Sequence, residues 1–600
     1  MPGAGGDVIR ALAALPGAVT PNDYLANLLV RGGGFDDNLT LLDGVPAAYP
    51  FHFGGLESVF HPGLIREAVF LPGAFDVRFG DTLGGVLDLR TQRSPQGVHG
   101  EGGLSAVQAS GLLSYAGKDD GWQSAATARR GWFDLVLNSD ANFVGVPRWQ
   151  DYHLHQRGTF LGGEVRWLAF GSRDSLTAKG GPGTHDSQFD SSFDVFGAGF
   201  HVPAGPWQVD LRGSASYGRT AVDLGPDLTL ERRPYAFQLV AEGDAVLATD
   251  HAVNGGLQWQ QTNTILEGAF ARLPVELGSG LDFNALTRTT VSALGRKGVS
   301  SVWAQDRWQL LTRAAMSLGV RLDQVDVTSE FHFSPRWSLE LQAWEGGTLR
   351  AAVGDYFQSP NPMETVPGWT STLARSALVR SYTGGLQQRF GRAELRLEAY
   401  HKDFERRLPD IVVPAGAAGS VILNAANTGW AEGAEAMLRF PALGPFSGWL
   451  SYAWSDVERS SGYGGYYDAD FSQPHVGNVV LEAELGWGLT LGGRWRLASG
   501  IPYTPVASRS YDPVSLHWVP VFGATNSARL DPYQRLDLRL EKRWFPVVPD
   551  WWTKISAFVE VFNALDAVNI TSVTYEDDYS DIRRIRQFPR LFFGGVDLAF

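Results

Sequence analysis

The stretch that decides the fold runs from Trp207 to Tyr217 and reads WQVDLRGSASY. Apolar or small residues occupy every second position, and polar residues lie between them. Successive side chains of a β-strand point to opposite faces, so this period predicts a strand with one apolar and one polar face. Residues 535–541 (RLDLRLE) repeat the pattern, with leucines alternating with charged residues. The chain beyond residue 95 is therefore predicted to be a succession of such strands.

Alternation suits both a soluble sandwich and a membrane barrel, and two features favour the barrel. The predicted strands have about 10–14 residues, against about 5–6 in soluble sheets, which is long enough to cross a bilayer at a tilt. The polar face carries Arg and Asp together while the other carries Leu and Trp, as expected for a polar lumen and a lipid-facing wall. The mean hydropathy is −0.12, and no apolar run reaches the length of a membrane-spanning helix.

The composition narrows the function classes. The chain has 71 Gly, 34 Phe, 20 Trp and 18 Tyr among 600 residues, which is typical of many strands and turns. It has no Cys, so disulfide scaffolds, thiolate metal sites and cysteine nucleophiles are excluded. The formal charge of −14 argues against nucleic acid as a partner, because binding phosphate backbones needs a basic face.

The first 95 residues follow a different pattern. Asp7 is a candidate N-cap for a helix over residues 7–15, and Pro16-Gly17 would end it. In NLTLLDGVP (residues 38–46) the Asp43-Gly44 pair predicts a hairpin turn. We therefore expect a compact mixed α/β domain over residues 1–95 and a β-barrel over residues 96–600.

The chain ends in LFFGGVDLAF, which places an aromatic, Phe600, as the last residue of an alternating strand. A terminal strand of this form resembles the signal read by the outer-membrane barrel-assembly machinery. Phe600 is therefore the predicted assembly residue.

Three motifs in the N-terminal region resemble the plug of TonB-dependent outer-membrane receptors. They are VRGG (residues 30–33), LDGVP (42–46) and PGAFDVRFG (72–80). The later segments FSPR (333–336), GIPYTP (500–505) and VFNAL (561–565) resemble the barrel of the same family more loosely.

The resemblance implies a transmembrane β-barrel of about 22 antiparallel strands with a mixed α/β plug in its lumen. Residues 100–600 would then supply about 23 residues for each strand with its connection, which is sufficient. It further implies a bacterial outer-membrane receptor that imports a scarce solute, such as a metal chelate, vitamin or oligosaccharide. The implied partners are outer-membrane lipid, a TonB-like energy-transducing protein, the barrel-assembly machinery and an unknown small solute.

The first residues, MPGAGGD, show no export signal, and no TonB-contacting segment precedes the predicted helix. These residues therefore do not by themselves predict energy coupling. The alternative function is an uncoupled receptor or a structural envelope barrel, and a soluble glycan-binding protein is a third possibility. No catalytic motif occurs, so neither an enzyme nor a cofactor is expected.

Family resemblance implies that Arg31 and Arg78 meet Glu435 as a polar latch between plug and barrel. The family often has a second acid on a barrel strand, where this chain has Thr383. Glu435 is therefore expected to carry more of the latch here than in relatives.

Ligand contacts are expected from aromatic clusters on the plug and in long loops, although interface girdles could also explain such residues. The candidates are Tyr49, Phe51, His52, Tyr356, Phe357, Trp369, Tyr463, Tyr466, Tyr467 and Tyr503. Two weaker metal sites, the His153 and His155 pair and the acidic string at 576–581, are more simply read as solvated loops.

Overall fold

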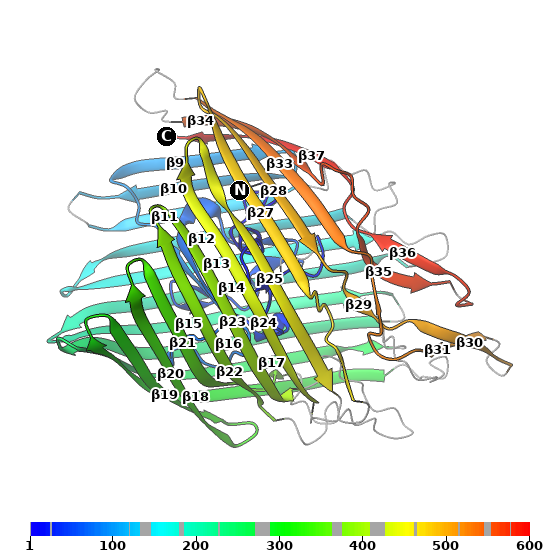
Figure 1. The fold of residues 1–600 in the computed structure, drawn as a ribbon, viewed down its shortest axis with the longest axis horizontal. Coiled ribbons are helices and arrows are strands. Elements are labelled where there is room, and N and C mark those ends of the chain that lie inside the picture. Colours follow the sequence, from blue (N-terminus) through cyan, green and yellow to red (C-terminus); the bar gives the residue numbers. More distant parts are fainter. Residues whose placement is uncertain are drawn as a thin grey trace.

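A single closed sheet dominates the fold (Figure 1). The computed structural model describes residues 2–23, 27–53, 55–118, 121–132, 146–178, 185–225, 228–270, 289–362, 375–407, 427–460, 465–513, 517–544, 554–576 and 578–600. In these residues 22 antiparallel strands form a closed barrel, which confirms the predicted fold class. The barrel strands are β9 (Gly97–Ser105), β10 (Gln108–Ala116), β11 (Gln123–Gly131), β12 (Val146–Phe160), β13 (Gly163–Ala178), β14 (Ser187–Ala204), β15 (Trp207–Asp223), β16 (Leu228–Ala248), β17 (His251–Phe270), β18 (Thr289–Leu311), β19 (Ala314–Val325), β20 (Glu330–Trp344), β21 (Gly347–Gln358), β22 (Ala377–Phe390), β23 (Ala393–Arg407), β24 (Asn427–Leu443), β25 (Phe446–Ser460), β27 (His475–Gly486), β28 (Leu489–Ala498), β33 (Tyr533–Trp544), β34 (Lys554–Phe562) and β37 (Leu591–Ala599).

The last strand closes the barrel against the first. β37 pairs with β9, and the backbones of Phe600 and Gly100 exchange two hydrogen bonds of 2.9 and 3.0 Å. A Cβ atom at Gly100 would lie 2.3 Å from the Phe600 ring, so the absence of a side chain there makes room for the terminal aromatic. The closed sheet has no free edge, which a strand structure in lipid requires.

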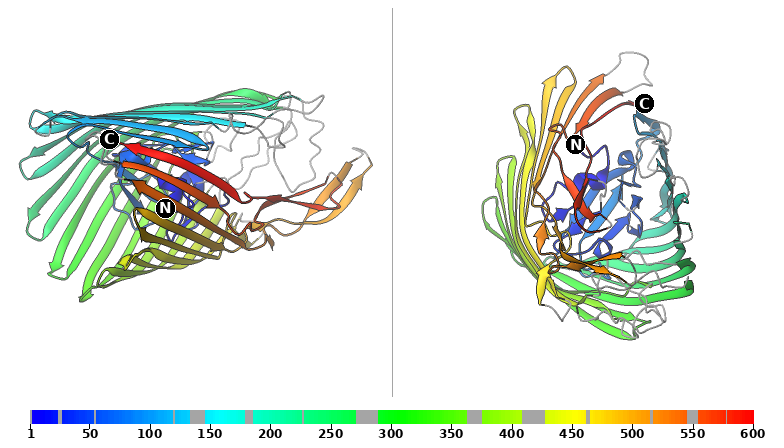
Figure 2. Two further views of the ribbon diagram at one scale, coloured as in Figure 1. Left: turned by 90° about the horizontal axis from the view of Figure 1, so that it is seen from above. Right: turned by 90° about the vertical axis from the view of Figure 1, so that its right-hand side faces the viewer.

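Connections alternate in length between the two ends of the barrel. At the short-turn end, most strand pairs are joined by two residues, as at 161–162 and 205–206. At the opposite, long-loop end, two hairpins project beyond the barrel (Figures 1 and 2). The additional strands at this end are β26 (Tyr466–Asp468), β29 (Pro502–Tyr503), β30 (Val506–Asp512), β31 (His517–Phe522), β32 (Ala528–Arg529), β35 (Ile570–Tyr575) and β36 (Ile582–Arg586).

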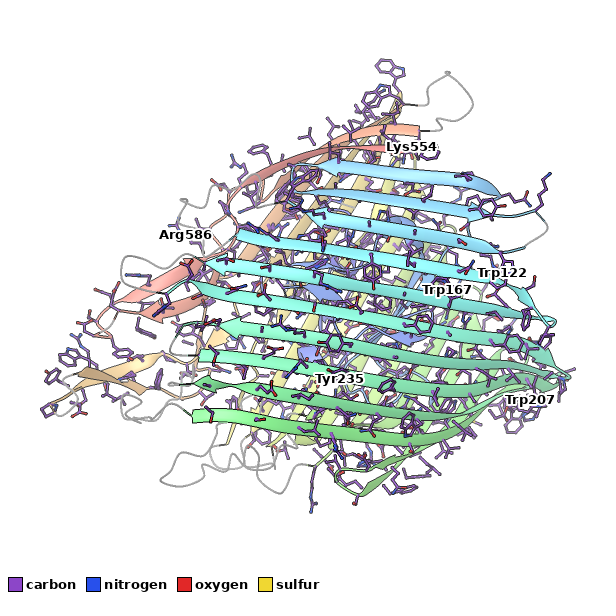
Figure 3. All side chains as sticks on the ribbon, turned by 180° about the vertical axis from the view of Figure 1, so that it is seen from behind. Trp122, Trp167, Trp207, Tyr235, Lys554 and Arg586 are labelled. Carbon is purple, nitrogen blue, oxygen red and sulfur yellow. The ribbon has the colours of Figure 1, made fainter. Side chains whose placement is uncertain are left out.

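The outer wall carries an apolar belt whose height matches a bilayer. On β15 the outward residues run from Trp207 to Tyr217, and these eleven residues of tilted strand span about 25 Å. Figure 3 shows Trp167 and Trp207 towards the short-turn end and Tyr235 nearer the middle. Beyond Tyr217 the outward positions become charged, with Arg219 Nε lying 2.9 Å from Glu231 Oε1.

Several strands are longer than the predicted 10–14 residues. β18 has 23 residues and β16 has 21. The excess extends past the apolar belt at the long-loop end, where ion pairs rather than lipid contacts cover the outer face. None of the described helices is long and apolar enough to cross a membrane.

The N-terminal region (residues 2–91) lies inside the barrel (Figure 2). Four of its strands form a small mixed sheet in the order β4-β3-β8-β7. Its elements are α1 (Val8–Leu12), the 3-10 helices η1 (Phe35–Asp37) and η2 (Pro62–Leu64), and strands β1 (Ala18–Val19), β2 (Leu29–Val30), β3 (Leu39–Leu42), β4 (Val45–Pro46), β5 (Phe51–His52), β6 (Glu57–Ser58), β7 (Ile65–Leu71) and β8 (Val86–Thr91).

Local signals in this region act as the sequence predicts. The Asp7 carboxylate caps α1 by accepting from Ile9 N and Arg10 N, although the helix ends at Leu12 rather than Leu15. Asp43 and Gly44 adopt positive φ angles of 48° and 80°, as a tight hairpin turn between β3 and β4 requires.

The N-terminal region does not enclose a core of its own. Its buried residues, such as Phe60 and Leu89, share one cluster with Phe170 of β13 and Phe193 of β14. The barrel wall therefore completes the apolar core of the region that it surrounds.

We expect deletion of Phe600 to reduce barrel assembly strongly, because the residue pairs with Gly100 where the sheet closes. The measurement is the amount of heat-modifiable, folded band in isolated membranes. Phe592→Ala, on the same strand but 68% exposed to the outside, is the matched control and should assemble normally. Equal assembly of both variants would mean that the terminal aromatic has no part in closure.

Candidate functional site

Arg31 joins the N-terminal region to two barrel carboxylates. Its Nε lies 2.8 Å from Glu435 Oε1, and its Nη2 lies 2.6 Å from Glu435 Oε2 and 2.5 Å from Glu398 Oε2. The guanidinium also lies 4.7 Å from the Tyr400 ring centre. Burial lowers the pKa of Arg31, but the charges of Glu435 and Glu398 raise it by more, so the net pKa is raised and the guanidinium stays charged.

Glu398 is the part of this contact that sequence reasoning missed. It is the direct cross-strand partner of Glu435, on β23 and β24. Two carboxylates in register repel unless a cation lies between them. Their shared inward face was readable from the alternation of residues 393–399, but their register was not. Glu398 thus supplies the second acid that Thr383 does not.

Arg78 does not reach Glu435, contrary to the expectation. Its Nη2 lies 3.2 Å from Asp244 of β16, and its Nε lies 3.3 Å from Asp76. The reason is the position of residues 75–79, which lie against β19 and β20 because barrel arginines bind their backbone. Arg78 therefore faces β16 rather than β24.

Barrel cations hold the backbone of the N-terminal region at several points. Arg336 Nη1 donates to the carbonyls of Phe75 and Phe79, at 3.2 and 2.9 Å. Arg321 Nη1 donates to Val77 O at 3.3 Å, and Lys402 Nζ donates to Leu83 O at 3.1 Å. These contacts recognise carbonyl groups, so no side-chain pattern in residues 75–83 predicts them.

His52 lies between two barrel carboxylates instead of facing a ligand. It is fully buried, with Nδ1 2.6 Å from Asp174 Oδ1 and Nε2 2.9 Å from Asp151 Oδ2. Both ring nitrogens can donate only in the imidazolium form. Burial lowers the pKa of His52, but the bonds to Asp151 and Asp174 raise it above its ordinary value.

The same cluster includes Arg129 and Glu57. Arg129 Nη2 lies 2.7 Å from Asp151 Oδ2, and its Nη1 lies 3.3 Å from Glu57 Oε1. Burial raises the pKa of Glu57 to about 7. Trp149 stacks on the His52 ring with centres 4.4 Å apart.

A large cavity of about 1260 Å³ opens between the N-terminal region and the wall towards the long-loop end. Predicted ligand residues Tyr49, Phe51 and Tyr467 line it. So do Phe35 and Phe471, whose ring centres are 5.5 Å apart. The volume exceeds the 300–1,000 Å³ of usual small-molecule pockets.

Residues 100–564 match the family model described as TonB dependent receptor-like, beta-barrel. The chain belongs to the TonB-dependent receptor family. A search of curated protein sequences finds no match.

Solved structures of similar fold support the same architecture for this receptor. The ferric citrate transporter FecA in its unliganded form is 16% identical with a TM-score of 0.74, covering 99% of this chain and 94% of that one. The outer membrane transporter YddB from Escherichia coli is 11% identical with a TM-score of 0.74, covering 100% and 96%. The siderophore receptor PirA from Pseudomonas aeruginosa is 14% identical with a TM-score of 0.67, covering 99% and 96%.

The other predicted ligand residues that the structure describes do not line the cavity. Tyr356 is 4% exposed and packs 4.6 Å from Phe75, and Phe357 is 2% exposed and stacks on His332. Both are buried where β21 contacts the N-terminal region or the neighbouring wall. Tyr466 is exposed outside the cavity lining, and Tyr503 lies in β29. Trp369 and Tyr463 lie outside the described residues.

The described residues contain no group of three or more His, Cys, Asp or Glu that could hold a metal ion. His153 is instead hydrogen-bonded to Thr127 at 3.1 Å. His155 contacts Asp43 of the N-terminal region at 3.0 Å.

We expect Glu435→Gln to loosen the N-terminal region and increase passive leak of a small antibiotic across the outer membrane. Glu398 still holds Arg31 in this variant, so the double change Glu398→Gln/Glu435→Gln should leak more, with a loss of about 3–5 kcal/mol for a buried uncompensated cation. Glu432→Gln, on the opposite strand face, is the control. Equal leak in the Glu432→Gln and Glu435→Gln variants would contradict a latch between Arg31 and Glu435.

We expect the attachment of residues 49–60 to weaken as pH rises above neutrality. The raised pKa of His52 gives a stabilisation that is complete below its unfolded pKa of about 6.5 and is lost as pH passes the folded pKa. Glu57, whose pKa is about 7, is half ionised at pH 7 and completes its titration near pH 8, so hydrogen exchange of this segment between pH 8 and 9 isolates His52.

His52→Gln should flatten that pH dependence. His61→Gln is the control, because burial lowers the pKa of His61 to about 4 and the residue is uncharged over this range. An unchanged slope in His52→Gln would show that the imidazolium does not control the attachment.

Proposed function

We propose that this protein is an outer-membrane importer that binds a scarce solute in the cavity and admits it when an energy-transducing partner moves the N-terminal region. In this proposal the N-terminal region is the plug. The solute class is a metal chelate, a vitamin or an oligosaccharide, and the partner is a TonB-like protein of the inner membrane. Membership in the TonB-dependent receptor family implies the outer membrane of a Gram-negative cell.

One observation carries the proposal. The lumen of the closed barrel is filled by residues 2–91, which both polar contacts and shared apolar clusters hold to the wall, and the cavity faces the long-loop end. A passive pore would have an open lumen, whereas a filled one needs a moving part. The ion pairs between this region and the wall are suited to a moving part, because water can solvate the charged groups when the pairs open.

The cavity has mixed recognition chemistry. Tyr49, Phe35 and Phe471 offer aromatic faces, and Arg232 and Lys297 offer cations. Lys297 Nζ already lies 2.7 Å from Asp81 Oδ2. This combination suits a polar ligand with a flat or ring-shaped part, which all three solute classes provide.

A disulfide tether tests whether the N-terminal region moves. A Cβ atom at Gly197 of β14 would lie 3.4 Å from Val45 Cβ, close to the separation that a disulfide needs. The chain has no native Cys, so Val45→Cys/Gly197→Cys introduces a single possible bridge. We expect the oxidised double variant to bind ferric citrate, cobalamin or a maltooligosaccharide as the wild type does but to abolish its energised uptake.

Reduction should restore uptake, and the Val45→Cys single variant should transport at the wild-type rate whether or not oxidant is present. The ligand used in this test is whichever of the three quenches the tryptophan fluorescence of the wild type when it binds. Uptake that continues through the oxidised tether would contradict a moving plug. Binding with no energised uptake in the wild type would favour an uncoupled receptor instead.

A further inference from the structure

A second, small cavity lies between the N-terminal region and strands β28 and β33. Four arginines line it, Arg10, Arg494, Arg496 and Arg535, together with the two carboxylates of Asp23 and Asp537. Its volume is about 20 Å³. That is the room needed by about one water molecule or one monatomic ion.

Arg535 uses both carboxylates. Its Nη1 lies 2.8 Å from Asp23 Oδ1, and its Nε lies 2.7 Å from Asp537 Oδ1. Tyr533 Oη also donates to Asp23 Oδ1, at 2.6 Å. Both carboxylates that line the cavity are therefore already paired with the same guanidinium group, that of Arg535.

Arg494 and Arg496 are buried without a carboxylate partner. They are 6% and 7% exposed, and no carboxylate oxygen among the described residues lies within 4.0 Å of either. Arg494 makes one long bond, 3.5 Å to Asn478 Oδ1, and Arg496 bonds to Thr20 and Gln473. Among the described atoms, Arg494 Nε, Arg496 Nε and Arg535 Nη2 are buried with no hydrogen-bond acceptor.

A buried guanidinium cannot avoid the cost of burying its charge by losing its proton. Burying an uncompensated charge costs several kcal/mol, so such groups are normally paired. Arg10 shows the same crowding, since burial and the charge of Arg535 lower its pKa. The cavity thus combines an excess of positive charge, N–H donors without an acceptor, and room for one atom.

We propose that this cavity binds one chloride ion, held by Arg494, Arg496 and Arg535. A polyatomic oxyanion is larger than the space for about one water molecule that the cavity offers. The ion neutralises part of the excess positive charge and accepts hydrogen bonds from the N–H groups that have no other acceptor. It thereby fastens the start of the N-terminal region, through Arg10, Thr20 and Asp23, to β28 and β33.

A water molecule is the competing occupant. Asp23 Oδ2 is also buried without a hydrogen-bond donor among the described residues, and water could bridge it to an arginine. Water would satisfy hydrogen bonds but leave the charge excess in place. The two occupants differ in their response to halide, which makes them separable.

The direct test uses bromide as the probe in crystals of the full chain. We expect an anomalous bromide peak in the cavity, in contact with the Arg494 and Arg496 guanidinium groups. A peak of water density with no anomalous signal would overturn the proposal.

The solution test compares urea unfolding in detergent micelles in sodium chloride and in sodium gluconate at equal ionic strength. Above the dissociation constant, each tenfold rise in chloride should shift the folding equilibrium about tenfold, because the ion binds the folded state. Arg494→Met should lose this chloride dependence. Arg350→Met, which removes an exposed arginine paired with Glu340 at 3.2 Å, should keep it.

Equal unfolding of the wild type in the two salts would contradict a chloride site. The same chloride dependence in Arg494→Met as in the wild type would contradict the placement of the chloride site at Arg494. Should Arg494→Met fail to assemble, the bromide measurement on the wild type still decides between ion and water.

Discussion

A barrel of 22 strands encloses a lumen that its own inward side chains cannot fill. Everything inside this molecule depends on that constraint. Residues 2–91 occupy the lumen, and their apolar core is completed by Phe170 and Phe193 of the wall. A second shared cluster joins Phe75, Leu83 and Val86 to Tyr356 and Val379. The N-terminal region and the barrel are therefore two halves of one packed interior.

The constraint also explains why the wall binds backbone as well as side chains. A small region with short strands leaves many carbonyl groups unpaired, and buried carbonyls need donors. Arg336, Arg321 and Lys402 project from the wall and supply them. The wall acts as the missing hydrogen-bonding partner of residues 75–83.

The fold was predictable because strand periodicity is local. Alternation around Trp207 to Tyr217, the Asp43-Gly44 turn and the terminal Phe600 each depend on a few neighbouring residues. The site was predictable only in part. Arg31 and Glu435 meet as the family resemblance implies, but Arg78, His52 and Tyr356 have other partners, because alternation tells which face a residue occupies and not which part of the wall lies opposite. Glu398 was missed for a related reason, since register across β23 and β24 depends on the whole sheet.

The shared interior also determines what resists displacement of the N-terminal region. When that region moves, water can enter the lumen and solvate Glu398, Glu435, Asp151 and Asp174, and a solvated ion pair contributes only about 0–1 kcal/mol. Each apolar side chain drawn from the shared clusters into water instead costs about 1.5–3 kcal/mol. Phe60 is fully buried, and its ring centre lies 6.1 Å from that of Phe170 in the wall, so it loses that contribution in full. The ion pairs therefore set the position of the N-terminal region, whereas the apolar clusters set the work needed to move it.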